Sequence, residues 1–410
     1  MTGNGNDVES ILEGLSGPGG IEHATMYLEA HWEALLDDII NIAEIPSPSF
    51  AERDRGVYVA ERMKAFGLDA VGIDSMNNVV GRYRGQDPVA RLLIVAHLDS
   101  VFPVEVDTRV TRRKDRLQGP GIGDNATSVA VLLHLIAAWQ SQDYLPPFDI
   151  LISANAAEEG LGDLKGIRHL LDEAEQSEDA ALEAVLSLDG HLGAVVNAGI
   201  GSRRLKVSFT AMGGHSWGDF GAPSAIHTLG TCIHDLCQID VPLTPRTTYN
   251  VGVIRGGTSV NTIAEYAEMV LDLRSASASA LRGLEDDVRQ RIKRRCDKDV
   301  VEYLVQVVGD RPSGQLSPDH AIVQLAKAIG GELDLRLVLR AGSTDANIPL
   351  SRGMPAITLG VYSGRGAHRE KEMMFPDSLR KGFPLAYGVA RSMVMWAAKA
   401  QLGRETANGS

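Results

Sequence analysis

Residues 91–100 read RLLIVAHLDS, an apolar run that ends in a histidine and a carboxylate. Three more short apolar runs have the same character, namely NNVVGRY at 77–83, FDILISANA at 148–156 and AVLSLDG at 184–190. Helical stretches such as residues 127–141 alternate with them. Buried strands interleaved with helices predict an α/β fold, in which a mostly parallel sheet has helices on both faces.

The N-terminal and C-terminal parts are predicted to be helical. After a loose start, helices are expected over residues 21–45 and 51–66, because apolar positions recur with helical spacing and Pro46 and Gly67 end the two patterns. A last helix is expected near residues 376–400.

Residues 201–310 have a different pattern. The segment RRLKVSFTA at 203–211 alternates polar and apolar residues, as a strand with one wet face does. Two helices, near 224–238 and 278–296, and three further strands, at 247–254, 266–275 and 300–308, complete the segment. They predict an antiparallel sheet with helices on its other face. We therefore expect an α+β lid domain at 201–310, inserted into an α/β domain made of residues 1–200 and 311–410, since 410 residues are too many for one core.

Composition excludes several classes of partner. The formal net charge is −13, from 40 basic and 53 acidic residues, whereas nucleic-acid binding needs a basic face. No apolar run reaches the length of about 18 residues that a membrane span needs, and the first residues are polar and acidic. Three cysteines argue against a disulfide framework, and we expect them to be small buried residues. The expectation is a cytoplasmic protein that binds neither nucleic acid nor membrane.

Polar residues with metal-binding chemistry follow the predicted strands. His97 and Asp99 alternate with an apolar residue, so they project to one side of a strand end, where a carboxylate can orient a metal-bound imidazole. A hydrogen-bonded structural histidine is the alternative. Asp189 and His368 follow other apolar runs. In open α/β sheets, ligands bind outside the carboxyl ends of the strands, so these side chains are expected to converge.

Two further segments supply carboxylates to this edge. A glycine-rich turn carries Asp124 to the start of a helix, where it could bridge two cations or merely cap the helix. Glu158 and Glu159 are adjacent after a buried strand, and their repulsion and lost hydration require compensation. A metal ion bound by one glutamate would provide this compensation and would leave the other glutamate as a proton acceptor. A solvated loop is the alternative.

Together these segments resemble a known family. The ordered motifs HLD, GxGxxDN, EEG, LDG, GGHSW, GSTDANIP and GAH are similar to those of the M20 family of metallopeptidases and amidohydrolases, from about residue 31 to 401. The resemblance implies a di-metal catalytic domain interrupted by a lid that often mediates dimerisation. Two departures affect the substrate more than the metals: Asn125 begins a segment where many relatives have a lysine, and His191 follows Asp189 without an assigned role.

The resemblance also implies roles for the site residues. His97 and Asp189 would hold one metal ion, Glu159 and His368 the other, and Asp124 would bridge them. Asp99 would orient His97, and Glu158 would act as the general base. The mixed imidazole and carboxylate set favours zinc, with manganese or cobalt as alternatives.

Further residues match family positions that contact substrate. His215 in the lid matches a residue that reaches the substrate or its oxyanion, within one subunit or across a dimer. Asn261 and Arg274 match positions that bind a substrate carboxylate, although a surface ion pair is the default for Arg274. In the segment 343–345, Ser343 and Thr344 match positions that line the site, and Asp345 could instead cap a helix.

The resulting prediction is a di-metal hydrolase that cleaves a C–N bond of a small, carboxylate-bearing substrate or short peptide, by default as an exopeptidase of the dipeptidase or tripeptidase type. The alternative is a non-peptide amidohydrolase acting on an N-acyl amino acid or an aromatic amine such as an aminobenzoate. A homodimer through the lid is expected.

Two other classes compete with this interpretation. Residues 214–218 satisfy the G-x-S-x-G pattern of serine hydrolases, with Ser216 as nucleophile, but the half-wet strand before them and Pro223 after them argue against a nucleophile elbow. A metal-binding protein without activity is the other alternative, and the unligated base Glu158 argues against it.

Overall fold

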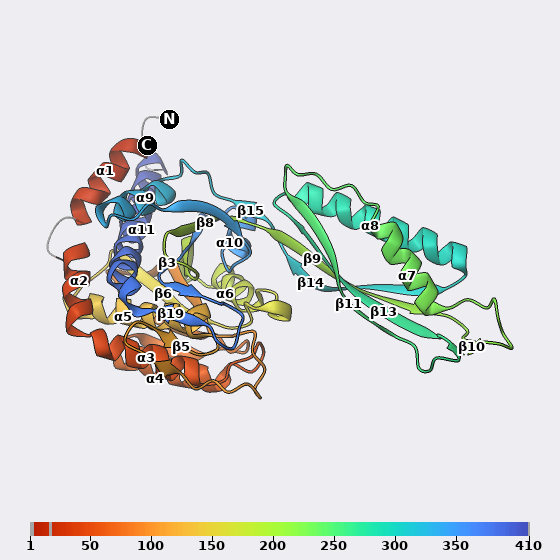
Figure 1. Cartoon of the computed structure of the whole chain (residues 1–410). Helices are drawn as coiled ribbons and strands as arrows, with labels where there is room; N and C mark the ends of the chain where they lie inside the picture. The colour runs from red at the N-terminus through yellow and green to blue at the C-terminus, as the bar shows by residue number, and fades with distance from the viewer. Residues whose placement is uncertain (1–3, 16–18, 409–410) are drawn as a thin grey trace. The chain divides into compact units, whose positions relative to one another are not determined.

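The protein divides into two compact units (Figure 1). A computed structural model describes residues 4–15 and 19–408. The larger unit comprises the described residues up to 198 and from 315 onward, and the smaller unit comprises residues 199–314. Each unit has its own hydrophobic core.

A nine-stranded sheet forms the centre of the larger unit. Four adjacent strands at its middle, in the order β6-β3-β7-β17, are parallel to one another. Antiparallel strands extend the sheet on both sides. The strands in spatial order are β1 (Asp69–Ile73), β2 (Val79–Tyr83), β6 (Phe148–Asn155), β3 (Asp87–His97), β7 (Ala180–Leu188), β17 (Ala356–Leu359), β8 (Ala194–Gly199) and β15 (Gly314–Gln315), with β16 (Val338–Gly342) paired to β8.

The central strands are covered on both faces. From Leu92 to His97 every residue of β3 is buried, and β6 is buried along nearly all its length. Such continuous burial is the property of parallel strands between helical layers. The helices that pack on this sheet are α4 (Arg53–Ala65), α5 (Ser128–Gln140), α6 (Lys165–Gln176) and α11 (Leu379–Asn408). The predicted α/β fold is confirmed.

Further helices complete the larger unit: α1 (Asn4–Leu15), α2 (Ile21–Ala30), α3 (Trp32–Glu44), α9 (Ala321–Glu332) and α10 (Asn347–Ser351). Among the residues that the structure describes, one helical stretch, Ile122–Gln140, is long and apolar enough to cross a membrane, and 89% of it is buried inside the protein. This burial is what the core helix of a folded domain shows.

A small antiparallel sheet stands beside the large one. Its order is β18 (Ser363–Arg365), β19 (Met373–Phe375), β5 (Leu117–Gln118) and β4 (Thr111–Arg112). The pairing of β19 with β5 joins two segments that lie far apart in the chain. It holds the loop between β18 and β19 against the glycine-rich segment that follows β5.

The smaller unit is a four-stranded antiparallel sheet with two helices. The strand order is β11 (Thr247–Gly256), β13 (Tyr266–Ser275), β9 (Gly201–Thr210) and β14 (Glu302–Arg311). Helices α7 (Ala225–Leu236) and α8 (Ala278–Asp299) pack against it and against each other. Buried and less buried residues alternate along β9, as the sequence predicted. A two-stranded antiparallel sheet, in which β10 (Gly214–His215) pairs with β12 (Thr262–Ile263), completes the unit.

Three local predictions were wrong. The helix expected at 21–45 is two helices, α2 and α3, separated at His31, whose φ of −118° interrupts the helical backbone. The loose start contains helix α1 over Asn4–Leu15. Cys232 and Cys296 are buried and free as expected, but Cys237, just after α7, is free and exposed.

Candidate metal centre

Three neighbouring parallel strands deliver the first group of polar side chains to one edge of the sheet. His97 is the last residue of β3, Glu158 and Glu159 follow β6, and Asp189 follows β7 directly. Since β6, β3 and β7 are adjacent and parallel, their carboxyl ends meet at the same edge.

Asp124 lies at the centre of this edge and contacts two histidines. Its Oδ1 lies 3.1 Å from Nε2 of His97, and its Oδ2 lies 3.1 Å from Nε2 of His368. The cap position of the following helix α5 belongs to Thr127, and no side chain caps it. Asp124 therefore has the position of a bridge between two binding points rather than of a helix cap.

His368 reaches this edge from the loop between β18 and β19. Its backbone has a φ of 64°, and its Nε2 also lies 3.1 Å from Oε1 of Glu159. The loop is fixed because the N–H of Gly119, directly after β5, donates to the carbonyl of Glu372 at 3.0 Å. The small sheet thus positions His368 opposite Asp124.

Asp99 organises the edge through both His97 and the Glu158–Glu159 turn. Nδ1 of His97 lies 3.0 Å from the Asp99 carbonyl and 3.5 Å from its Oδ1. The Asp99 carboxylate accepts the backbone N–H groups of Glu158 and Glu159, each at 2.9 Å, and the Ser49 hydroxyl at 2.7 Å. With Nδ1 occupied as a donor, Nε2 is the ring nitrogen of His97 that faces the site, and it can bind a metal ion once its own proton has left.

Two overlapping groups of potential ligands result. In the first, ligand atoms of His97, Asp124 and Asp189 all lie within 4.8 Å of one another. In the second, the same holds for Asp124, Glu159 and His368. A third group joins His97 with Glu158 and Glu159, which are only 5% and 8% exposed, so these glutamates are not in a solvated loop.

The electrostatics of the edge show an excess of negative charge. Burial and the Asp124 carboxylate raise the pKa of Asp189 to about 7. Burial alone would lower the pKa of His97, but the carboxylates of Asp124 and Asp99 raise it well above its usual range. Hydrogen bonds with Asp124 and Glu159 raise the pKa of His368 to about 10. In the metal-free protein, the raised pKa values mean that protons on these groups offset part of the negative charge. Bound cations would offset the same charge in their place.

The donor set fits two divalent ions. The buried guanidinium of Arg55 donates to the carbonyls of Ile45 and Leu98 at 2.7 Å rather than to the carboxylates. Two imidazoles and three carboxylates, with Asp124 shared, supply the nitrogen and oxygen ligands that zinc, manganese and cobalt accept.

Two buried glutamates at this edge were missed by the sequence analysis. Glu372 is 1% exposed, and its Oε1 accepts the backbone N–H of Asp124 at 3.1 Å. Burial and the nearby Asp124 raise its pKa to about 8. Glu52 is fully buried and accepts the backbone N–H of Ala157 at 3.0 Å. Glu372 thus holds the backbone of Asp124, and Glu52 holds the residue before Glu158; no local motif marks either glutamate.

His215 and Asn261 lie together in the smaller unit. The strand pairing aligns His215 with Thr262, and the N–H of Ser216 donates to the Asn261 carbonyl at 3.0 Å. Nδ1 of His215 accepts the N–H groups of Trp217 and Gly218 at 3.2 and 3.3 Å. A neutral His215 therefore carries its proton on Nε2 and is a donor there.

Arg274 lies at the end of β13 that is farther from the β10–β12 pair. Its Nε donates to Oδ2 of Asp272 at 2.6 Å, which is the surface ion pair expected by default. In the larger unit, Ser343 and Thr344 lie between β16 and α10, where the Thr344 hydroxyl contacts that of Thr358 at 2.7 Å.

The remaining residues have structural contacts. Asp345 accepts a hydrogen bond from Asn155 at 2.9 Å and does not cap α10, since the cap position is Ala346. His191 is exposed and its ring lies 5.2 Å from that of Tyr362. Asn125 donates to the carbonyl of Leu188 at 3.0 Å, the residue before Asp189.

The geometry around Ser216 does not form a nucleophile elbow. The strand β10 before it has two residues, an exposed turn follows, and the next helix, α7, begins only at Ala225. An elbow needs a buried strand leading directly into a helix.

Known proteins share this sequence and fold. Residues 93–392 match the model of "Peptidase family M20/M25/M40". The chain is 27% identical to acetylornithine deacetylase from Myxococcus xanthus, over 81% of this chain and 88% of that protein. It is 25% identical to carboxypeptidase G2 from Pseudomonas sp. (strain RS-16), over 82% of each.

Solved structures agree with the fold. A tripeptidase from Staphylococcus aureus superposes with a TM-score of 0.73 at 19% identity, over 88% of this chain and 98% of that one. The YXEP protein of Bacillus subtilis, described as a dinuclear metal-binding peptidase of family M20, gives a TM-score of 0.66 at 14% identity, over 89% and 99%. The family model covers most of the chain, so this protein belongs to peptidase family M20/M25/M40 and is a metal-dependent hydrolase.

Proposed function

We propose that the larger unit binds two zinc ions at the edge formed by β6, β3 and β7. His97 and Asp189 hold one ion, Glu159 and His368 hold the other, and Asp124 bridges them. The observation that carries this proposal is the division of the Asp124 carboxylate, with one oxygen 3.1 Å from each histidine. Manganese and cobalt accept the same ligands and are alternatives to zinc.

Two bound ions would lower the pKa of a shared water toward neutrality and stabilise the oxyanion formed when it attacks a carbonyl. Glu158 then takes the water's proton and passes it to the departing nitrogen. Its backbone N–H is held by Asp99, and its carboxylate lies within 4.8 Å of ligand atoms of His97 and Glu159. Asp99 is a positioning residue, because it acts through His97 and the glutamate turn.

We propose as substrate a small molecule or short peptide with a carboxylate near the scissile C–N bond, hydrolysed by default as an exopeptidase. The likeness to carboxypeptidase G2 and to a tripeptidase supports this class. The likeness to acetylornithine deacetylase favours a second candidate, the deacylation of an N-acyl amino acid. A third candidate substrate is an aromatic amine such as an aminobenzoate, because proteins of one fold can hydrolyse different C–N bonds.

The smaller unit is proposed to complete substrate binding. Nε2–H of His215 is the donor for the substrate carbonyl or oxyanion, because Nδ1 is held by two backbone N–H groups. Asn261 and Arg274 are proposed to bind the substrate carboxylate, for which the planar guanidinium of Arg274 is suited. Because Asn261 precedes β13 and Arg274 lies near its other end, the two side chains would have to come from different subunits. Ser343 and Thr344 are proposed to line the site.

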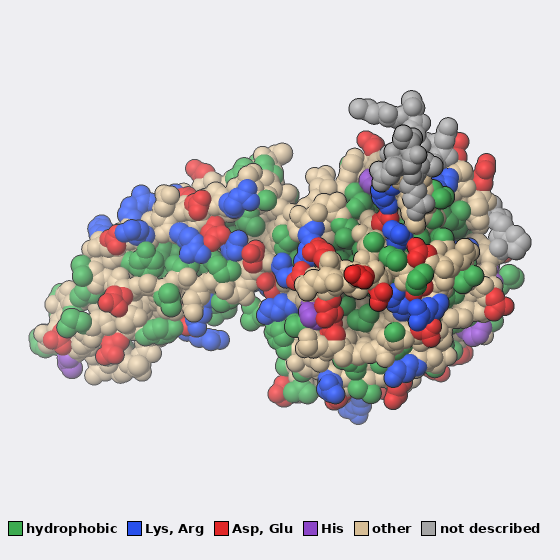
Figure 2. Space-filling model, turned by 180° about the vertical axis from the view of Figure 1, so that it is seen from behind, with side chains coloured by type: hydrophobic (Ala, Val, Ile, Leu, Met, Phe, Trp, Pro, Cys, Tyr) green, Lys and Arg blue, Asp and Glu red, His purple; other side chains and the backbone are tan. Residues whose placement is uncertain are grey.

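We further propose that two copies of the chain form a homodimer through the smaller unit. Four large apolar side chains lie in the loops around the β10–β12 pair and are almost fully exposed: Met212 at 91%, Trp217 and Phe220 at 89% and Val260 at 102%. We call these four residues the β10–β12 patch. Hydrophobic side chains are also visible on the surface of this unit in Figure 2. Exposed apolar patches of this kind mark interaction surfaces.

Substrate screening of the zinc-loaded protein tests the proposal. Mass spectrometry would follow hydrolysis across dipeptides, tripeptides, N-acyl amino acids and aminobenzoates. We expect turnover of substrates with a free carboxylate, removed by a chelator and restored by zinc. Turnover that survives complete metal removal would contradict the metal-based mechanism.

A further inference from the structure

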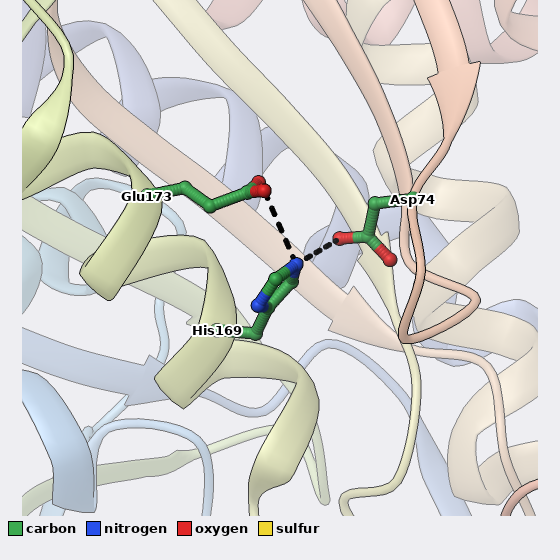
Figure 3. A group of neighbouring side chains, drawn as sticks. All are labelled: Asp74, His169 and Glu173. Atoms are coloured by element: carbon green, nitrogen blue, oxygen red, sulfur yellow. Dashed lines mark ion pairs between the residues drawn. The ribbon is translucent and has the colours of Figure 1, made fainter.

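A second set of metal-ligating side chains lies apart from the residues of the first. Asp74 comes from the turn between β1 and β2, and His169 and Glu173 come from helix α6 (Figure 3). The two helical residues are four positions apart, so their side chains lie on one face of α6. In Figure 3 both point toward the carboxylate of Asp74.

The three side chains meet at a single ring nitrogen. Nε2 of His169 lies 3.3 Å from Oε1 of Glu173 and 3.7 Å from Oδ2 of Asp74. The Ser75 hydroxyl is a further oxygen, 3.4 Å from the same nitrogen. An ion held tetrahedrally at bonds of about 2.1 Å separates its ligand atoms by about 3.4 Å. The observed separations are close to this spacing.

One imidazole N–H cannot satisfy these oxygens. Nε2 carries at most one hydrogen, which points along one direction, yet two carboxylates and a hydroxyl face it. If Nε2 is unprotonated, its lone pair faces two anionic groups. A cation between the nitrogen and the carboxylates would bind all of them at once, which a proton on Nε2 does not do.

Asp74 is held in place before any ligand binds. Its Oδ1 accepts the backbone N–H groups of Met76 at 2.8 Å and Asn78 at 2.9 Å, and its Oδ2 accepts the Asn78 side chain at 2.7 Å. Asn78 is fully buried and also donates to the carbonyl of Gly166, in the first turn of α6, at 3.2 Å. Asn78 therefore connects the β1–β2 turn to helix α6. Because the turn and the helix that supply the ligands are already held together, metal binding loses little conformational entropy.

Solvent and ions have access to the three side chains. The side chains of Asp74, His169 and Glu173 are 14%, 27% and 60% exposed. A groove of 360 Å³ has Asp74 and Glu173 in its wall. A fourth ligand from water can therefore complete the coordination.

We propose that Asp74, His169 and Glu173 form a third divalent-metal site, which takes zinc or a similar transition ion and fastens the β1–β2 turn to α6. Its effect is on stability rather than on the reaction. Hydrogen bonds connect the β1–β2 turn to the turn after β6, since the N–H of Ala156 donates to Asn78 at 2.8 Å and Asn77 donates to Glu52 at 3.3 Å.

Zinc stoichiometry of the full-length protein tests this site. Metal-free wild type, His169→Ala and Glu173→Gln would be dialysed against equal free zinc, and the bound zinc measured by mass spectrometry. Glu175→Gln is the matched control, because Glu175 is exposed on the same helix and pairs with Arg352. We expect His169→Ala to bind one equivalent of zinc less than wild type. Glu173→Gln should bind that equivalent at least tenfold more weakly, about the loss expected for a removed ligand contact. Glu175→Gln should match wild type.

The difference in bound zinc between wild type and variants does not depend on how many ions bind at the edge formed by β6, β3 and β7. The outcome therefore tests this site separately from the proposed function. Zinc should also raise the melting temperature of wild type more than that of His169→Ala, because an ion that binds only the folded state stabilises it. Turnover at saturating zinc should be equal in the two. Equal zinc stoichiometry and equal affinity in wild type and both variants would overturn the proposal.

Discussion

The carboxylate of Asp99 accepts the backbone N–H of Glu158 at 2.9 Å, so the residue that follows His97 by two positions also fixes the proposed general base. The same carboxylate accepts the N–H of Glu159. A single buried side chain, 0% exposed, thus connects the end of β3 to the turn after β6. The histidine, the ligand glutamate and the base depend on it together.

Asp99→Ala is expected to impair both metal binding and turnover. It frees the two backbone N–H groups of Glu158 and Glu159 and removes the carboxylate that lies 3.5 Å from Nδ1 of His97, while the Asp99 carbonyl that Nδ1 contacts at 3.0 Å remains. Losses of such supporting contacts cost about 10- to 100-fold in metal affinity or activity. Zinc affinity and kcat would be measured on the purified variant. Asp107→Asn, an exposed carboxylate paired with Arg109, is the control and should change neither. Full affinity in Asp99→Ala would contradict the role of Asp99.

Glu372 is expected to act through its oxygen rather than its charge. Its Oε1 accepts the N–H of Asp124, so Glu372→Gln keeps that contact while Glu372→Ala leaves a buried N–H unpaired. We expect kcat to fall about 10-fold or more in the alanine variant and much less in the glutamine variant. Steady-state kinetics on both variants checks this. Equal losses in the two would show that the negative charge matters instead.

Zinc binding is expected to release protons and to weaken as the pH falls. In the metal-free protein, Asp124 and Glu159 raise the pKa of His368 to about 10, so this ring is protonated at pH 7 and the proton must leave when zinc binds. Affinity should therefore rise with pH up to about pH 10, by about tenfold per unit for each proton released. Calorimetry at one pH, in two buffers of different ionisation enthalpy, measures the number of protons. Heats that do not depend on the buffer would contradict the protonated metal-free site.

The β10–β12 patch is expected to hold two copies of the chain together. Replacing Trp217 and Phe220 by serine removes two large exposed apolar side chains, so the dimer should shift toward monomer. Light scattering coupled to gel filtration measures the mass. Leu243→Ser, at a residue 91% exposed in the same unit but outside the β10–β12 patch, is the control. A monomeric wild type, or a double variant that stays dimeric, would contradict the proposed interface.

The convergence of side chains at the edge formed by β6, β3 and β7 could be predicted from the sequence, because parallel strands align their carboxyl ends. His97, Glu159 and Asp189 each follow an apolar strand, and this pattern alone indicates that they share an edge. The α/β fold was predicted for the same reason, from short buried runs separated by helices.

Other parts left no local pattern. Glu372 and Glu52 act on backbone groups of residues 248 and 105 positions away, which only the folded chain brings near. The separation of α2 from α3 at His31 is equally invisible, because the apolar spacing continues across it. The cluster of Asp74 with His169 joins a turn to a distant helix, and its helical pair has the sequence pattern of an ordinary surface pair.

The measurement that tests the central claim most directly is the zinc content and turnover of Glu158→Gln. Glutamine keeps the size of the side chain and cannot take the water's proton, while the five proposed ligands remain. We predict that zinc content equals that of wild type and that kcat falls by at least about 100-fold, the contribution of general-base catalysis. Turnover near the wild-type rate with full zinc would contradict Glu158 as the base, and loss of zinc would place Glu158 among the ligands.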